Sequence, residues 1–279
     1  MKKRLIPLLV AALLTLSACA TLDSNDVSAT DAVSSGDMVV EVVQEQELER
    51  DSHGRLKYYA AMLEQYPNMV GWITVPNTII DYPVVQGQDN DYYLTHDYKN
   101  DENRNGAVYV DFRARIGLND TSRCVVIHGH HMRSGIMFQN IIRYDDPEFY
   151  AANPVIKFDS IYNPGEWLIF AEMKIDAYGG EDGMPTFNFM QFNFDSDDDF
   201  MSFVSDIRAH SVYDTSSLVD VTASDQLLIL STCSYEFDDC RTVLAARRLR
   251  FGETPNLTGV TFAENPIMPP AWGSWEGHL

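Results

Sequence analysis

Eight short runs of strand-forming residues, spread over residues 70–249, constrain the fold of this chain more than any other feature. Each run is rich in Val, Ile, Tyr or Phe, and turn-forming Pro, Gly, Asn or Asp residues separate the runs. Many strands with few helices predict a mainly β domain, built as a closed barrel or a sandwich. The runs are VGWITV (70–75), IIDYPVV (79–85), GAVYVDF (106–112), CVVIHG (124–129), VIKFD (155–159), EWLIFAEMKI (166–175), LLILSTC (227–233) and TVLAARRL (242–249).

Two further segments have the apolar spacing of helices. In residues 48–65 the apolar positions recur at i, i+3, i+4 and i+7, which predicts an amphipathic helix. Those positions are Leu56, Tyr59, Ala60 and Leu63. Residues 197–209 begin with three Asp residues, at the end of a helix where the dipole favours negative charge.

The first twenty residues have the features of an export signal. A basic start, Lys2–Arg4, precedes an apolar stretch, Leu5–Leu16, that is shorter than the ~20 residues of a bilayer span. The stretch ends in Leu-Ser-Ala-Cys, which looks like a bacterial lipobox with Cys19 as the lipidated mature N-terminus. Because Ala18-Cys19-Ala20 also fits an ordinary cleavage site, a secreted form stays open. Lipidation would tether the protein to the outer face of a membrane.

The rest of the chain divides by composition. Residues 21–46 are poor in aromatic residues and rich in acidic ones, which predicts a flexible, solvated tether. We expect the folded domain at 47–262 and an irregular, Pro- and Gly-rich tail at 263–279. The formal net charge of −21 argues against nucleic acid as a partner.

The stretch LLILSTCSYEFDDCR contains two of the three cysteines that remain once the signal is removed. An odd count in an exported chain indicates a free thiol. The short turn predicts an antiparallel hairpin, which brings Arg241 back beside Cys233. Since side chains alternate along a strand, Cys240 then faces away, and a disulfide between the two cysteines is disfavoured. We expect the acidic side chains of the turn, Glu236, Asp238 and Asp239, to be solvated, with orientation of His130 or Arg241 by one of them as the alternative.

A His-rich turn follows the apolar run that begins at Cys124. A thiol becomes a useful nucleophile beside a proton acceptor or a cation, and a Gly next to a His at a strand end can direct an imidazole. Three neighbouring histidines could also contribute metal ligands, although a closed site needs further ligands from elsewhere. From the residues alone, His128, His130 and His131 stay open as base, metal ligands or a polar surface loop.

Four ordered blocks resemble those of class B sortases, cysteine transpeptidases of Gram-positive cell surfaces. Residues 70–94 resemble the family's N-terminal strand block, and GAVYVDFRA (106–114) its G-x-(I/V)-(F/Y)-x-D-x-R segment. HGHHMRSGIMFQNIIRY (128–144) resembles the catalytic-histidine block, and LSTCSYEFDDCR (230–241) the T-C signature that an Arg follows. The resemblance spans about residues 45 to 255. It implies a closed sortase-type β-barrel of about eight strands, with an N-terminal helix and a helical insertion before the cysteine strand.

Carried over position by position, the resemblance implies Cys233 as nucleophile, His130 as catalytic histidine and Arg241 as the stabiliser of the oxyanion. It also implies substrate-binding positions at Thr232, Ser231, Asn90, Leu94 and His128. A structural loop role for Asn90 and a core role for Leu94 stay open. His128 departs from the family, which commonly has Tyr there, and the lipobox-like Cys19 departs from the family's usual uncleaved transmembrane anchor.

The function that this resemblance implies is cleavage of a C-terminal sorting motif after Thr, followed by transfer to an amine. The partners would be exported proteins that carry the motif, and a peptidoglycan precursor or pilin amine, at the extracytoplasmic face of a Gram-positive cell membrane. No cofactor and no metal are implied. The alternatives are a hydrolase with the same Cys/His chemistry, a ligand-binding lipoprotein without catalysis, and a zinc site on the three histidines.

Overall fold

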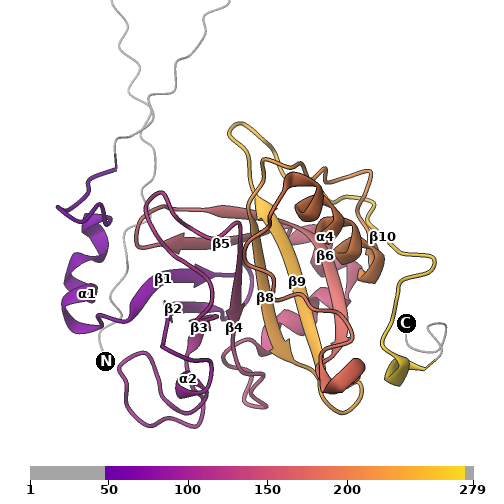
Figure 1. Ribbon diagram of the computed structural model, residues 1–279, viewed down its shortest axis with the longest axis horizontal. Helices are drawn as coiled ribbons and strands as arrows, with labels where there is room; N and C mark the ends of the chain where they lie inside the picture. The colour runs from indigo at the N-terminus through magenta and orange to yellow at the C-terminus, as the bar shows by residue number, and fades with distance from the viewer. Residues whose placement is uncertain (1–47, 274–279) are drawn as a thin grey trace, which may run out of the picture. The chain divides into compact units, whose positions relative to one another are not determined.

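The computed structural model describes residues 48–273, which form one compact unit (Figure 1). The predicted export signal, the predicted lipidation site Cys19 and the predicted tether all lie outside these residues. Within the described part, no helix has the length and apolar character that a membrane crossing requires.

Eight strands close into a barrel in the order β1-β2-β3-β4-β8-β9-β6-β5 within the described residues. The predicted mainly β fold is thus confirmed, and each of the eight runs contributes one strand. Neighbouring strands pair antiparallel except β2 with β3 and β4 with β8, which pair parallel. The strands are β1 (Met69–Thr74), β2 (Asp81–Val85), β3 (Val108–Val110), β4 (Cys124–His128), β5 (Val155–Ser160), β6 (Glu166–Asp176), β8 (Leu227–Cys233) and β9 (Cys240–Arg248).

The N-terminal helix is shorter than the apolar spacing predicts. It consists of one 3₁₀ turn, η1 (Lys57–Tyr59), and α1 (Ala60–Gln65). The expected helical start at residue 48 is wrong, because a tight turn forms there instead. The Asp51 carboxylate accepts two backbone N–H bonds in this turn, and Gly54 has a φ of +76° that a helix does not allow.

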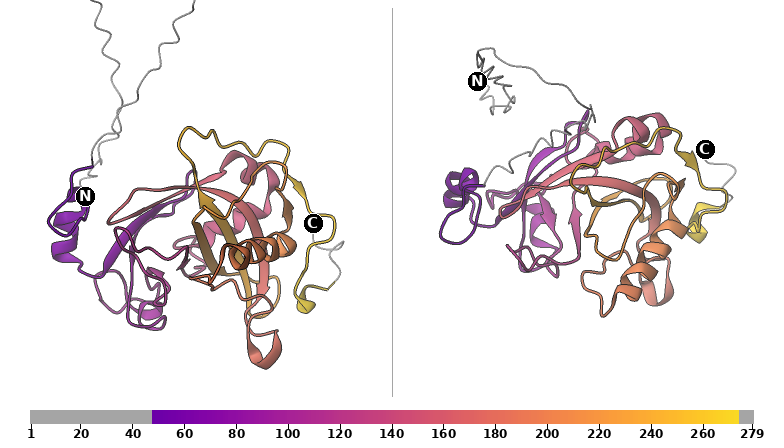
Figure 2. Two further views of the ribbon diagram at one scale, coloured as in Figure 1. Left: turned by 45° about the horizontal axis from the view of Figure 1, so that its top comes forward. Right: turned by 90° about the horizontal axis from the view of Figure 1, so that it is seen from above.

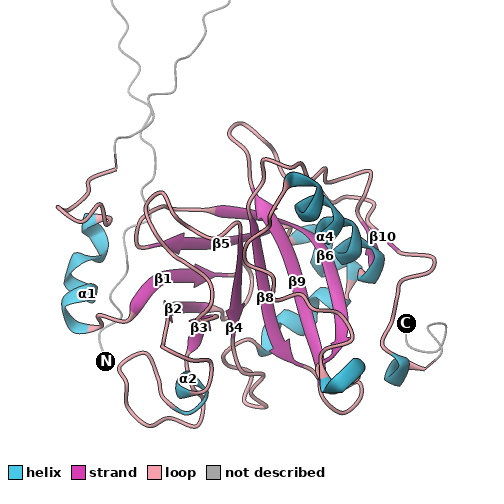
Figure 3. Ribbon diagram, in the orientation of Figure 1, coloured by secondary structure: helices cyan, strands magenta, loops and turns pink. Residues whose placement is uncertain are grey.

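The other helices lie outside the strand barrel, as Figure 2 and Figure 3 show. The predicted helix at 197–209 forms as α4 (Asp197–His210), with the Ser196 hydroxyl accepting the Asp199 N–H at its start. It lies beside β6 in Figure 1. The remaining elements are short: α2 (Tyr92–Thr95), η2 (Gln139–Asp145), α3 (Pro147–Ala152), η3 (Glu181–Gly183), β7 (Tyr213–Asp214), β10 (Thr261–Phe262) and η4 (Pro270–Trp272).

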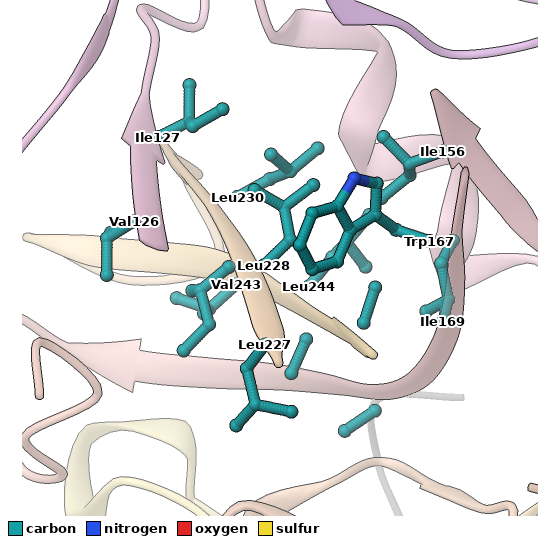
Figure 4. Close-up of a cluster of buried hydrophobic side chains, with 14 of the residues drawn as sticks. Val126, Ile127, Ile156, Trp167, Ile169, Leu227, Leu228, Leu230, Val243 and Leu244 are labelled. Carbon is teal, nitrogen blue, oxygen red and sulfur yellow. The ribbon is translucent and has the colours of Figure 1, made fainter. Parts of the chain in front are cut away.

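The core fills the barrel around β4, β6, β8 and β9, whose residues are buried along nearly their whole length. Figure 4 shows the Trp167 indole among aliphatic side chains that include Leu228 and Leu244. Strands covered on both faces read as continuous apolar runs, which is the pattern of LLIL at the start of β8. This packing fixes the ends of β4, β8 and β9, where the polar side chains of the site begin.

Candidate active site

The end of β8 and the start of β9 form one wall of a cavity of about 260 Å³. Cys233 pairs with Arg241 across the antiparallel ladder, and both side chains line the cavity. Cys240 is fully buried, and neither thiol is in a disulfide. The predicted hairpin therefore forms, and Cys240 faces away from the cavity, as the alternation of side chains along a strand predicts. The partly exposed Cys233 thiol lies opposite the Arg241 guanidinium.

The parallel pairing of β4 with β8 brings the histidine turn to the same place. His128 pairs with Ser231, and the buried Thr232 hydroxyl donates to the Gly129 carbonyl at 2.8 Å. The chain then turns so that His130 lines the cavity with Cys233. Segments about a hundred residues apart thus meet through backbone register, and one hydroxyl closes the junction between them.

A short loop and α2 form the opposite wall. The Leu94 carbonyl pairs with His130 Nε2 at 2.9 Å, so this wall holds the imidazole. The Leu94 side chain is 37% exposed, which rules out the core role. Gly106 packs against the same ring with φ at +61°, and an added Cβ would stand 3.0 Å from His130 Cδ2.

The three histidine rings point to three different partners. His128 Nε2 lies 3.3 Å from an Asp111 oxygen, and His131 Nδ1 lies 2.9 Å from the Cys233 carbonyl, whereas His130 meets Leu94. Within residues 48–273, no three His, Cys, Asp or Glu side chains are grouped so as to hold a metal ion. The arrangement does not favour the zinc-site alternative.

A buried carboxylate, Asp111, supports the loop wall, and sequence reasoning assigned it no role. It accepts from Asn90 Nδ2 at 2.9 Å and from Arg113 Nη2 at 2.7 Å, in addition to its pair with His128. Burial raises the pKa of Asp111, but the hydrogen bonds from Arg113, His128 and Asn90 outweigh it, and the pKa falls well below its usual range. The sequence feature that could have pointed to this role is the position of Asp111 in the 106–114 block, which resembles a family motif containing Asp.

Asn90 lines the cavity, but both polar atoms of its amide hold the loop. Its Nδ2 donates to Asp111, and its Oδ1 accepts the Phe112 N–H at 3.0 Å. The structural alternative for Asn90 is therefore realised in these contacts.

A second buried charge cluster supports the strand wall from behind. Lys174 on β6 is 3% exposed and donates to Asp145 at 2.5 Å, to Glu236 at 2.9 Å and to Thr242 at 2.9 Å. Glu172 lies 3.4 Å from the same ammonium. Glu236 lies in an exposed turn as expected, but its side chain is not simply solvated, because it pairs with this lysine and is 24% exposed. Asp238 and Asp239 are exposed, as expected.

The Arg241 guanidinium keeps some of its N–H donors available for the cavity. Its Nη1 bonds the carbonyls of Asp239 and Cys240 at 3.3 and 3.1 Å, which folds one side of the guanidinium onto the hairpin. A guanidinium carries five N–H donors, so the remaining ones can serve a ligand in the cavity.

Solved structures of the same fold include sortase B proteins. Sortase B from Bacillus anthracis, in complex with AAEK2, superposes with a TM-score of 0.63 at 30% identity, over 73% of this chain and 88% of that one. A Staphylococcus aureus sortase B–substrate complex superposes with a TM-score of 0.61 at 27% identity, over 69% and 85% of the two chains.

In sequence, the chain is 36% identical to sortase B of Listeria monocytogenes over 173 residues, which are 61% of this chain. The chain spans 65% of that relative's length, slightly under two thirds. No family model matches the chain. The barrel, the likeness to solved structures and the ordered blocks agree, and the chain belongs to the class B sortase family of cysteine transpeptidases.

Proposed function

We propose that this protein cleaves a C-terminal sorting motif of another exported protein after Thr and transfers the new carboxyl end to an amine. The observation that carries the proposal is the shared cavity, where Cys233, His130 and Arg241 meet from the ends of separate segments. A thiol, an imidazole and a guanidinium are the groups that acyl transfer through a thioester needs.

In the first step, the Cys233 thiolate attacks the Thr carbonyl and forms a carbon–sulfur bond. The carbonyl electrons move to oxygen, and Arg241 donates hydrogen bonds to this oxyanion; its guanidinium keeps its proton at physiological pH. As the intermediate collapses, the carbon–nitrogen bond breaks, and His130 as imidazolium gives its proton to the leaving amine. A thioester on Cys233 remains.

In the second step, an incoming amine attacks the thioester carbonyl. Neutral His130 takes a proton from this amine, and Arg241 again receives the oxyanion. The new amide bond forms as the carbon–sulfur bond breaks, which restores the thiolate and the imidazolium. The acceptor in this proposal is a peptidoglycan cross-bridge or a pilin lysine.

The peptide would lie along the cavity lined by Ser231, Thr232, Asn90, Leu94 and His128. The two walls of this cavity differ in polarity. Leu94 gives one wall an exposed apolar surface, whereas Ser231 and His128 give the other wall polar atoms. The side chains of Thr232 and Asn90 form hydrogen bonds with the backbone of the site. We therefore assign these residues to maintaining the shape of the cavity more than to direct recognition of the peptide.

Class B sortases act at the surface of Gram-positive cells, and we propose the same location here. Cys19 would carry a lipid in the outer leaflet, and residues 21–46 would span the distance from the membrane to the catalytic domain. Growth with radiolabelled palmitate tests this anchor, since Cys19→Ala should abolish the label and release the protein into the medium.

A peptide library tests the transfer reaction. Quenched fluorescent peptides with a fixed Thr are incubated with the enzyme, with and without triglycine, and the products are analysed by mass spectrometry. We expect a thioester on Cys233, and amide-linked triglycine in the product when the amine is present. Cys233→Ala should abolish turnover, whereas Cys240→Ala, whose thiol is buried away from the cavity, is the matched control. Turnover that never incorporates the amine would favour the hydrolase, and turnover by the Cys233→Ala variant would exclude the nucleophile.

A further inference from the structure

The segment that includes α2 lines two separate cavities. Asn90 and Leu94 line the catalytic cavity, whereas Tyr92 and Tyr93 line a second cavity of about 410 Å³. The two cavities have no lining residue in common, and none of the catalytic residues belongs to the second one. The second cavity is therefore a site of its own, and α2 connects it to the catalytic cavity.

A buried tyrosine fixes two amides at the second cavity. The Tyr93 hydroxyl accepts from Asn68 Nδ2 at 3.0 Å and donates to Asn100 Oδ1 at 3.1 Å. These two bonds set the orientation of both amides, so Asn68 Oδ1 and Asn100 Nδ2 face away from the tyrosine. Within residues 48–273, neither of these two remaining atoms has a hydrogen-bond partner. The cavity thus presents one acceptor and one donor whose positions are fixed before any ligand binds.

Two glutamines contribute further polar atoms. Gln86 Nε2 donates to the carbonyls of Asp111 and Ala114 at 2.9 and 2.8 Å, which leaves Gln86 Oε1 as an acceptor. Gln88 is exposed, and in the described part of the chain neither polar atom of its carboxamide is bonded. A carboxamide both donates and accepts, so the cavity suits a ligand that also has both kinds of group.

The described residues that line the second cavity include one carboxylate and no cation. Asp89 Oδ1 accepts the N–H groups of Tyr92 and Asp91, and these bonds lower the pKa of the carboxyl. The Tyr92 ring is 40% exposed, and it stacks on His96 with the ring centroids 4.0 Å apart. An anionic ligand would meet the Asp89 charge without a compensating cation, so the cavity favours an uncharged polar ligand with an apolar face.

We propose that this second cavity binds a neutral saccharide that carries an N-acetyl group. Sugar hydroxyls donate and accept, as the free atoms of Asn68, Asn100 and Gln88 require. In a trans acetamido group the N–H and the carbonyl point in opposite directions, so they suit an acceptor and a donor on separate side chains. The C–H face of a sugar ring can pack on Tyr92. An extended peptide could not add by backbone pairing here, because β2 is already paired with both β1 and β3.

The assignment of this saccharide to the glycan of a cell-wall acceptor rests on the proposed function. In a peptidoglycan precursor, the peptide that supplies the amine is attached to a sugar. Because α2 lines both cavities, a peptide attached to a sugar in the second cavity has a short path to Cys233. Binding of the sugar would thus raise the local concentration of the amine at the thioester.

The binding test follows ¹⁵N-labelled protein by NMR while tri-N-acetylchitotriose is added. We expect the side-chain amide resonances of Gln88 and Asn100 to shift. Gln88→Leu should weaken the binding about tenfold, which is the usual value of one or two neutral hydrogen bonds. Gln226→Leu is the matched control, because this side chain lies just before β8 and also has no hydrogen bond among the described residues.

Two further ligands make the binding test specific. Cellotriose has the same linkage without the acetamido groups and should bind about tenfold more weakly than tri-N-acetylchitotriose. Triglycine should leave the Gln88 resonance unchanged. Equal affinity for the two trisaccharides, an unchanged affinity in Gln88→Leu, or a shift of Gln88 with triglycine alone would overturn the proposal, the last because it would indicate a peptide site.

The transfer test compares triglycine with triglycine that is linked through its carboxyl end to N-acetylglucosamine. In the wild type, we expect the linked acceptor to have a KM about tenfold lower, and Gln88→Leu should remove this difference. Equal KM values in the wild type would overturn the role of the cavity in acceptor binding. If the wild type cleaves no peptide, the proposed function fails, whereas the NMR titration still decides whether the cavity binds the saccharide.

Discussion

Two walls line the same cavity but are held in place by different interactions: the strand wall, formed by β8 and β9, and the loop wall, formed by α2 and the loop before it. Backbone ladders hold Cys233 and Arg241, because β8 is paired on both sides and its neighbours are buried. The loop wall has no ladder, and individual bonds from Asn90 to Asp111 and from His130 to the Leu94 carbonyl hold it. The barrel thus fixes Cys233 and Arg241 through backbone pairing, whereas the loop wall depends on single side-chain bonds, one of which also orients the His130 imidazole.

Each wall also has a buried charge behind it, and these two charges differ in how well they are satisfied. Asp111 receives only donors, so its network fixes a geometry. Lys174 faces Asp145, Glu236 and Glu172, and both Glu172 carboxyl oxygens lack a hydrogen-bond partner in the described residues. We therefore expect the support of the loop wall to be insensitive to pH, and the support of the strand wall to depend on it.

The largest effect on stability should come from Lys174→Met. The change leaves a group of carboxylates without their cation, and breaking a buried ion pair on one side costs about 3–5 kcal/mol in the free energy of unfolding. Denaturant unfolding measures it. Lys157→Met is the control, because that lysine pairs with Glu166 on the surface and should cost at most about 1 kcal/mol. Equal losses in the two variants would show that the Lys174 cluster does not support the strand wall.

Arg241→Lys tests the chemistry of the strand wall without changing its charge. Lysine lacks the planar fork of donors, so we expect kcat to fall about 10²-fold, or about 2.7 kcal/mol in the barrier, with little change in KM. Steady-state kinetics on the cleaved peptide measure both constants. Arg115→Lys, in an exposed pair with Asp120, is the control. A rise in KM at constant kcat would move Arg241 from oxyanion stabilisation to substrate binding.

The strand wall is predictable from sequence, and its support is not. Strand alternation and a short turn are local properties, so the residues alone predict a hairpin with Arg241 opposite Cys233. By contrast, Lys174 lies in a strand whose polar residues give no sign of burial, and its partners come from η2 and the β8–β9 turn. Asp111 is visible in the sequence only as part of a motif. Its role depends on His128 and Asn90, which the barrel brings together over long separations that no local pattern encodes.

Glu172→Gln sharpens the contrast in pH dependence. Burial raises the pKa of Glu172, with Asp145 adding to the rise and Lys174 opposing it. The folded protein therefore holds a proton that the unfolded chain releases near its ordinary pKa of ~4.3, so wild-type stability falls as pH rises above that value, by up to about 1.4 kcal/mol per pH unit. Glu172→Gln should remove this loss and gain stability over wild type as pH rises. The free energy of unfolding of both proteins is measured across this pH range. Curves that run parallel for wild type and Glu172→Gln would contradict the prediction.

The smallest expected effect lies at the junction of the strand wall with the histidine turn. Thr232→Val keeps the volume of a side chain that is 2% exposed but removes its bond to the Gly129 carbonyl, which should cost about 1 kcal/mol. Thr232→Ser keeps the hydroxyl and is the matched control. Since Gly129 precedes His130, we also expect kcat to fall further in the Val variant than unfolding alone explains, and the Ser variant to restore it. If Val and Ser behave alike in both measurements, the hydroxyl does not couple the two catalytic segments, and the backbone ladder between β4 and β8 aligns them without it.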